Sequence, residues 1–131
     1  MFKWLLCVFV VLVMGCTNSL LIRDSRNNDG DYKTIAMNLY RIAKTCWEQQ
    51  EPTFFAPTLV ESVVTLDSII VSARFDPSGV VIKPFIKFVV MPSGNNNAKV
   101  DLYYQEINWI GQKRHLEDSY NWLSGNYICS R

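Results

Sequence analysis

The chain has 131 residues, a length that fits one domain. Its 13 basic and 12 acidic residues give a net charge of +1, and no run of like charge is longer than two. Nucleic acids and other polyanions bind clustered lysine and arginine, so this composition argues against them as partners.

The first 15 residues have the pattern of a secretory signal peptide. Lys3 precedes an apolar run from Trp4 to Met14, and the small residue Gly15 comes just before Cys16. Such a run spans about 16 Å as a helix, which is about half of the hydrocarbon core of a bilayer. A permanent transmembrane helix is therefore not expected.

The segment Val13-Met14-Gly15-Cys16 resembles the lipobox of bacterial lipoproteins, although a small residue is usual in place of Met14. The resemblance implies cleavage before Cys16, a diacylglycerol on its sulfur and further acyl chains such as palmitate. In this family Thr17, rather than Asp, implies transfer to the outer membrane, where the protein faces the periplasm. An ordinary cleaved signal with an incidental cysteine is the alternative.

The number of cysteines agrees with lipidation. Cys7 leaves with the signal, so an exported chain would keep an odd number of cysteines, one of them unpaired. If Cys16 carries the lipid, Cys46 and Cys129 remain as a pair. We expect them to form a disulfide, as in other small exported domains.

Residues 17–31 are mostly polar and rich in turn-forming residues. They are predicted to be a flexible tether, apart from Leu20, Leu21 and Ile22, which are expected to touch the membrane or the domain. The predicted organisation is a signal peptide (1–15), a lipidated cysteine and tether (16–31), and one domain (32–131).

The domain is predicted to open with a helix over Tyr32–Gln50. Asp31 can cap its first turn, and Pro52 stops it. The apolar positions recur at helical spacing: Ile35, Leu39, Ile42 and Cys46.

A β-rich region follows. Residues 59–75 alternate with period 2, and the apolar phase flips at Asp67-Ser68, which indicates a turn or a bulge. A short helix over 57–66 is the alternative. Further strands are predicted over Val80–Met91 and Lys99–Trp109, joined by a hairpin through Pro92–Asn97. Pro84 would place the first of these at a sheet edge or a bulge.

After Gly111, the predicted elements are a short helix over His115–Leu123 and a final strand over Asn126–Cys129. The predicted fold class is α+β, with an N-terminal helix packed on an antiparallel sheet of three or four strands and a short C-terminal helix. This element order resembles that of cystatin-like folds. A resemblance of fold alone carries no function.

The residues that could carry catalysis are few. His115 is the only histidine, and it is interpreted as a surface residue although Asp118 and Ser119 lie near it in sequence. One histidine and two paired cysteines cannot complete a tetrahedral metal site, and no nucleotide or cofactor motif is present. We therefore expect a protein that is not an enzyme and needs no cofactor or metal.

The strand phases predict a recognition surface instead. If Val100, Leu102 and Tyr104 face the core, their neighbours face away from it. The predicted partner-binding residues are Tyr103, Lys87 and Lys83 on the sheet and Asn95 and Asn96 at the hairpin tip. A polar protein or glycan of the envelope is the expected partner, bound by a non-catalytic binding or assembly module. The alternative function is a periplasmic inhibitor or immunity lipoprotein that blocks a cell-wall hydrolase or toxin.

Overall fold

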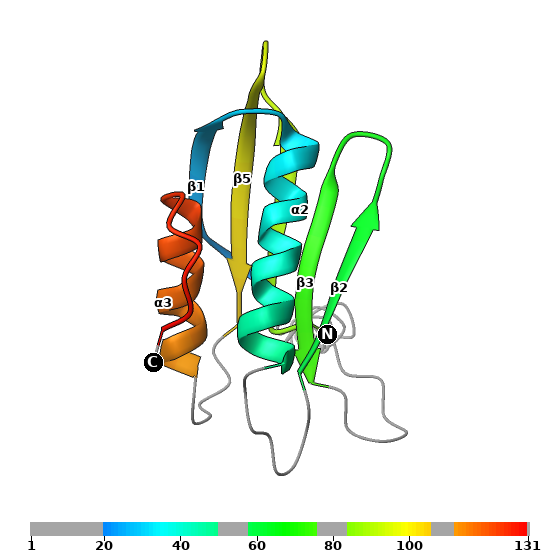
Figure 1. The fold of residues 1–131 in the computed structure, drawn as a ribbon. Coiled ribbons are helices and arrows are strands. Elements are labelled where there is room, and N and C mark those ends of the chain that lie inside the picture. Colours follow the sequence, from blue (N-terminus) through cyan, green and yellow to red (C-terminus); the bar gives the residue numbers. More distant parts are fainter. Residues whose placement is uncertain (1–19, 50–57, 76–83, 106–111, 131) are drawn as a thin grey trace, which may run out of the picture.

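The computed structural model describes residues 20–49, 58–75, 84–105 and 112–130 (Figure 1). In chain order, the elements are β1 (Leu21–Asp29), α2 (Tyr32–Ala43), the π-helical segment η1 (Lys44–Gln49), β2 (Thr58–Val64), β3 (Ile69–Phe75), β4 (Ile86–Pro92), β5 (Asn97–Tyr104) and α3 (Gln112–Leu123).

The strands form one five-stranded antiparallel sheet in the order β1-β5-β4-β3-β2. Helices α2 and α3 lie side by side over one face of it (Figure 1). The prediction of an N-terminal helix on three or four strands, with a cystatin-like element order, is therefore wrong. The first described element is a strand, and the sheet contains one strand more than the longest sheet predicted.

The additional strand is β1, which lies within the segment that we assigned to the tether. It pairs only with β5, so it forms an edge of the sheet. Two of its polar side chains bind the end of α3: Arg26 Nη1 donates to Ser124 Oγ (2.6 Å), and Asn28 Nδ2 donates to the Leu123 carbonyl (3.4 Å). The tether assignment is thus wrong for residues 23–29, because an edge strand can form from mostly polar residues.

The predicted first helix is confirmed as α2 and its continuation η1. Asp31 caps it by accepting a hydrogen bond from the Thr34 amide (3.2 Å). Gly30, with φ of +121°, lets the chain turn from β1 into this cap. In η1 two neighbouring residues, Cys46 and Trp47, lie in the core.

The β-rich region folds into two hairpins. The phase flip at Asp67-Ser68 is a tight turn, in which the Thr65 amide donates to the Ser68 carbonyl (2.8 Å). Of the two alternatives for residues 57–66, strand or short helix, the structure has a strand over Thr58–Val64. Pro84 precedes β4 and so removes no hydrogen bond from the sheet. The ends predicted for the two later strands, 80–83 and 106–109, lie outside the described residues.

The free edge of β2 is partly covered. The Val60 amide donates to Glu48 Oε2 of η1 (3.0 Å), which satisfies a backbone group on the side of β2 away from β3. Because an exposed edge strand is a template for pairing with other chains, this contact limits unwanted pairing.

The sheet has two distinct ends. The chain enters β1 at Leu21, which pairs with Tyr104 at the end of β5, whereas Asp29 pairs with Asn97 beside the β4–β5 turn. Both hairpin turns and the β1–α2 turn therefore lie at the end opposite to the entry into β1 (Figure 1). Among the described helices, none is long and apolar enough to cross a membrane.

Candidate functional site

The sheet face opposite the helices carries the predicted partner-binding residues. Val100, Leu102 and Tyr104 of β5 are buried on the helix side, while Tyr103 is half-buried on the other face. Lys87 pairs with Tyr103 across β4 and β5, and its Nζ lies 4.9 Å from the centre of the Tyr103 ring. The predicted orientation of Tyr103 and Lys87 is confirmed, and the pair forms a cation–π contact.

The neighbours of this pair make the face mixed in character. The same row across the sheet continues to Ser72 on β3 and to Ile22 on β1. In the next row Asp101 accepts a hydrogen bond from Ser25 Oγ (2.6 Å), and Lys99 Nζ lies 3.8 Å from the same carboxylate oxygen. Asp101 is buried by these contacts, although it lies on the face opposite the helices. We call the residues around Lys87 and Tyr103, with Ser72 and Ile22, the open face.

The predicted hairpin tip is a tight turn between β4 and β5. The Ser93 amide donates to the Asn97 carbonyl (2.8 Å), and Gly94 and Asn96 both have positive φ, at +69° and +56°. Asn tolerates this conformation better than most residues. The side chains of Asn95 and Asn96 are exposed. Lys83, the remaining predicted contact, lies outside the described residues.

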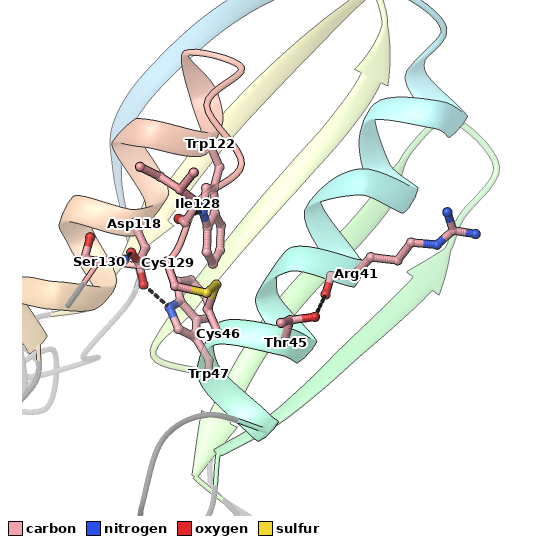
Figure 2. Close-up of a disulfide and its surroundings, with 9 residues drawn as sticks. All are labelled: Arg41, Thr45, Cys46, Trp47, Asp118, Trp122, Ile128, Cys129 and Ser130. Atoms are coloured by element: carbon pink, nitrogen blue, oxygen red, sulfur yellow. Dashed lines mark hydrogen bonds between the residues drawn. A yellow bond between two sulfur atoms is a disulfide. The ribbon is translucent and has the colours of Figure 1, made fainter.

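The predicted disulfide is present and joins η1 to the C-terminal segment (Figure 2). The Cα atoms of Cys46 and Cys129 are 5.4 Å apart. The strand predicted over Asn126–Cys129 is wrong, since these residues have no ladder partner. Side chains of α3 hold the segment instead: Trp122 Nε1 donates to the Ile128 carbonyl (2.8 Å), and Asp118 Oδ1 accepts from the Ser130 amide (2.6 Å).

His115 is not a surface residue, contrary to our interpretation. It is 0 % exposed and lies against two aromatic rings, 4.9 Å from that of Trp47 and 5.2 Å from that of Phe85. The buried face of α3 repeats at helical spacing through His115, Asp118, Ser119 and Trp122. The sequence analysis placed His115 on the surface, and so it missed this polar buried stripe.

The two polar neighbours of His115 have structural contacts. Ser119 Oγ donates to the His115 carbonyl (2.7 Å), and Asp118 Oδ2 accepts from Trp47 Nε1 (2.9 Å) (Figure 2). A Ser-His-Asp triad needs the serine hydroxyl to donate to the imidazole and the carboxylate to orient it. The Ser119 hydroxyl instead binds a carbonyl of its own helix, and the Asp118 carboxylate binds the Trp47 indole, which joins α3 to the core.

A pocket of about 460 Å³ lies at the end of the molecule that carries the turns. It is formed by the β1–α2 turn, the first turns of α2 and the segment after α3. Its polar lining residues are Asn27, Asn28, Asp29, Asp31, Thr34, Asn38, Ser124 and Tyr127. The sequence reasoning missed this pocket because its residues come from segments about 100 positions apart.

Tyr127 forms one wall of the pocket. Burial raises the pKa of its phenol above the ordinary value of 10.0, and a hydrogen bond with the Asn38 side chain opposes that shift. The phenol therefore remains protonated at neutral pH and can both donate and accept a hydrogen bond.

Within the four described ranges, no group of three or more histidine, cysteine or acidic side chains is placed to hold a metal ion. Comparison of the chain with protein-family models, with curated proteins and with solved structures gave no match.

Proposed function

We propose that this protein is a lipid-anchored, non-catalytic binding module of the bacterial envelope that uses its open face to recognise another envelope protein. The observation that carries the proposal is the Lys87–Tyr103 pair on the sheet face away from the helices. Tyrosine in a partly exposed, rigid position is a frequent interface anchor, because it offers large contact area at little entropic cost. The lysine adds charge beside that anchor.

The direction of the chain fits an anchor at Cys16. Four residues, Thr17 to Leu20, separate Cys16 from β1, and fully extended they reach at most about 14 Å. Leu21, the first residue of β1, is 62 % exposed, so an apolar side chain lies at the end of the sheet nearest to the proposed anchor. With nine residues, β1 then carries the opposite end about 30 Å outward.

The open face suits a protein partner with a polar surface. It combines an aromatic ring, a lysine and hydroxyl groups, and its side chains lie on a continuous sheet. A hydrophobic small molecule would require a concave apolar pocket. The proposed site of action is the outer membrane, with the domain facing the periplasm, in accordance with the lipobox-like segment and Thr17.

One structural feature supports the alternative function, an inhibitor of an envelope enzyme or toxin (Figure 1). The β4–β5 hairpin projects beyond the other strands and helices, and it carries Asn95 and Asn96 at its exposed tip. A projecting, rigid turn is the shape that can enter the cleft of an enzyme. In that case the tip, rather than Tyr103, would make the central contact.

Site-specific photo-cross-linking in intact cells distinguishes these functions. A photoreactive amino acid is placed at Tyr103, at Asn95 or, as a control, at the exposed Met37 on the outer side of α2. Our proposal predicts a discrete cross-linked protein from position 103 and none from position 37. A cross-link from Asn95 alone would favour the inhibitor, and equal cross-linking from positions 103 and 37 would refute both.

A further inference from the structure

The pocket beside Tyr127 is separate from the open face and has a different chemistry. Its volume of about 460 Å³ lies within the range of roughly 300–1,000 Å³ that is usual for small-molecule sites. Asn27, Asn28 and Asn38 line it from β1 and α2, and Ile35 and Leu123 give it apolar surface. Asn28 already donates one hydrogen bond to the Leu123 carbonyl, and Asn38 is hydrogen-bonded to Tyr127, so each keeps part of its donor and acceptor capacity for a ligand.

The charges around the pocket exclude an anionic ligand. None of the described lining residues is basic, and Asp29 and Asp31 are acidic. Arg26 reaches Ser124 of the lining, but its guanidinium is paired with Asp24 at 2.8 Å. A phosphate or a carboxylate would therefore meet two negative charges without a free cation to offset them.

The start of α2 is not an anion site either. Asp31 already caps it, because its carboxylate accepts from the amide and the hydroxyl of Thr34 at 3.2 and 3.3 Å. The ligand must consequently be recognised by side-chain amides, hydroxyls and the ring of Tyr127. These groups alternate between donors and acceptors, as the hydroxyl groups of a sugar do.

We propose that this pocket binds an uncharged sugar unit, such as an N-acetylhexosamine of an envelope glycan. The amides of Asn28 and Asn38 and the phenol of Tyr127 contact its hydroxyl and acetamido groups, while the apolar side packs on Leu123 and the Tyr127 ring. The site lies at the end of the sheet remote from Leu21. It therefore points away from the membrane if Cys16 is the anchor.

The test compares three hexosamines of different charge, of which N-acetylmuramic acid also carries a lactyl ether and glucosamine lacks the acetyl group. N-acetylglucosamine is neutral, glucosamine is cationic and N-acetylmuramic acid is anionic. Binding to the purified full chain in micelles of a detergent without sugar groups is followed by saturation-transfer NMR. We expect saturable binding of N-acetylglucosamine with a millimolar dissociation constant. Binding of N-acetylmuramic acid should be at least about fivefold weaker, because its carboxylate would meet Asp29 and Asp31.

Two matched variants assign the binding to the pocket. Asn38→Ala removes a lining amide and should weaken N-acetylglucosamine binding about fivefold or more, as expected for a lost hydrogen bond. Gln49→Ala removes an exposed side-chain amide outside the pocket and should leave binding unchanged, and thermal melts establish that both variants are folded. No saturable binding up to about 50 mM, tighter binding of glucosamine, or full binding by Asn38→Ala would overturn the proposal.

Discussion

Removing the Cys46–Cys129 disulfide should lower the free energy of unfolding, and the size of this decrease depends on the length of the loop that the disulfide closes. The two cysteines are 83 positions apart. In the chain-entropy model, opening a loop of this length costs about 4.5 kcal/mol at 25 °C. A domain of this size has a total stability of only about 5–15 kcal/mol, so the crosslink supplies a large fraction of it.

The folded state should survive the loss of the crosslink. The Ile128 carbonyl still accepts from Trp122 Nε1, and the Ser130 amide still donates to Asp118, so the C-terminal segment keeps its position. The loss thus acts mainly by giving the unfolded chain more freedom. At about 4–5 °C per kcal/mol for a domain near 100 residues, the melting temperature should fall by about 20 °C.

Calorimetry with and without a reductant, and on Cys129→Ala, measures this shift. Cys129→Ala is preferable to Cys46→Ala because Cys129 is only half-buried, whereas Cys46 is fully buried and its replacement would add a cavity. Ile128→Ala is the matched control, since this side chain is 53 % exposed in the same segment and should change the melting temperature little. If the melting temperature decreased by less than about 5 °C both in the reduced protein and in Cys129→Ala, the loop-entropy argument would be refuted.

Three further predictions concern the anchor, the buried carboxyl group and the pocket tyrosine. Intact-mass measurement of envelope protein should find acylated Cys16 at the N-terminus, and Cys16→Ala should leave the chain uncut or soluble; an unmodified Cys16 would refute the anchor. Asp118→Ala should cost about 3 kcal/mol in denaturant unfolding, because it leaves the Trp47 indole and the Ser130 amide without their acceptor, whereas Glu117→Ala, on the exposed side of α3, should stay within about 0.5 kcal/mol. Because the pKa of Tyr127 is raised in the folded state, its contribution to stability is complete below pH 10.0 and is lost as the pH rises above that value; pH-dependent melts should show a steeper alkaline decline for the wild type than for Tyr127→Phe, and equal slopes would contradict the shift.

The parts of the fold that were predicted correctly have strong local signals. The first helix has a regular apolar stripe with a cap, and the turn at Asp67-Ser68 shows as a change of apolar phase. The orientation of Tyr103 followed from strict alternation in β5. The disulfide followed from the number of cysteines, independently of the local structure around Cys129.

The parts that were missed depend on tertiary contacts. β1 has a polar sequence, and its strand conformation is stabilised by pairing with β5 and by contacts to α3 from Arg26 and Asn28. The buried stripe of α3 contains His115 and Asp118, which hydropathy assigns to the surface. Asp118 is 1 % exposed because Trp47, 71 positions away, donates to it. Neither the pairing of β1 with β5 nor the hydrogen bond between Trp47 and Asp118 produces a pattern in the sequence.

The central claim is that the open face is a binding surface and not part of the core. The most direct test uses the partner protein that is captured by the cross-linker at position 103. It measures the affinity of this partner for the double variant Tyr103→Ala with Lys87→Ala. We predict affinity reduced about 30-fold or more, the level expected for a central interface anchor, and a melting temperature within about 3 °C of the wild type. Unchanged affinity would contradict the claim, and so would unfolding of the variant, which would make Tyr103 a core residue.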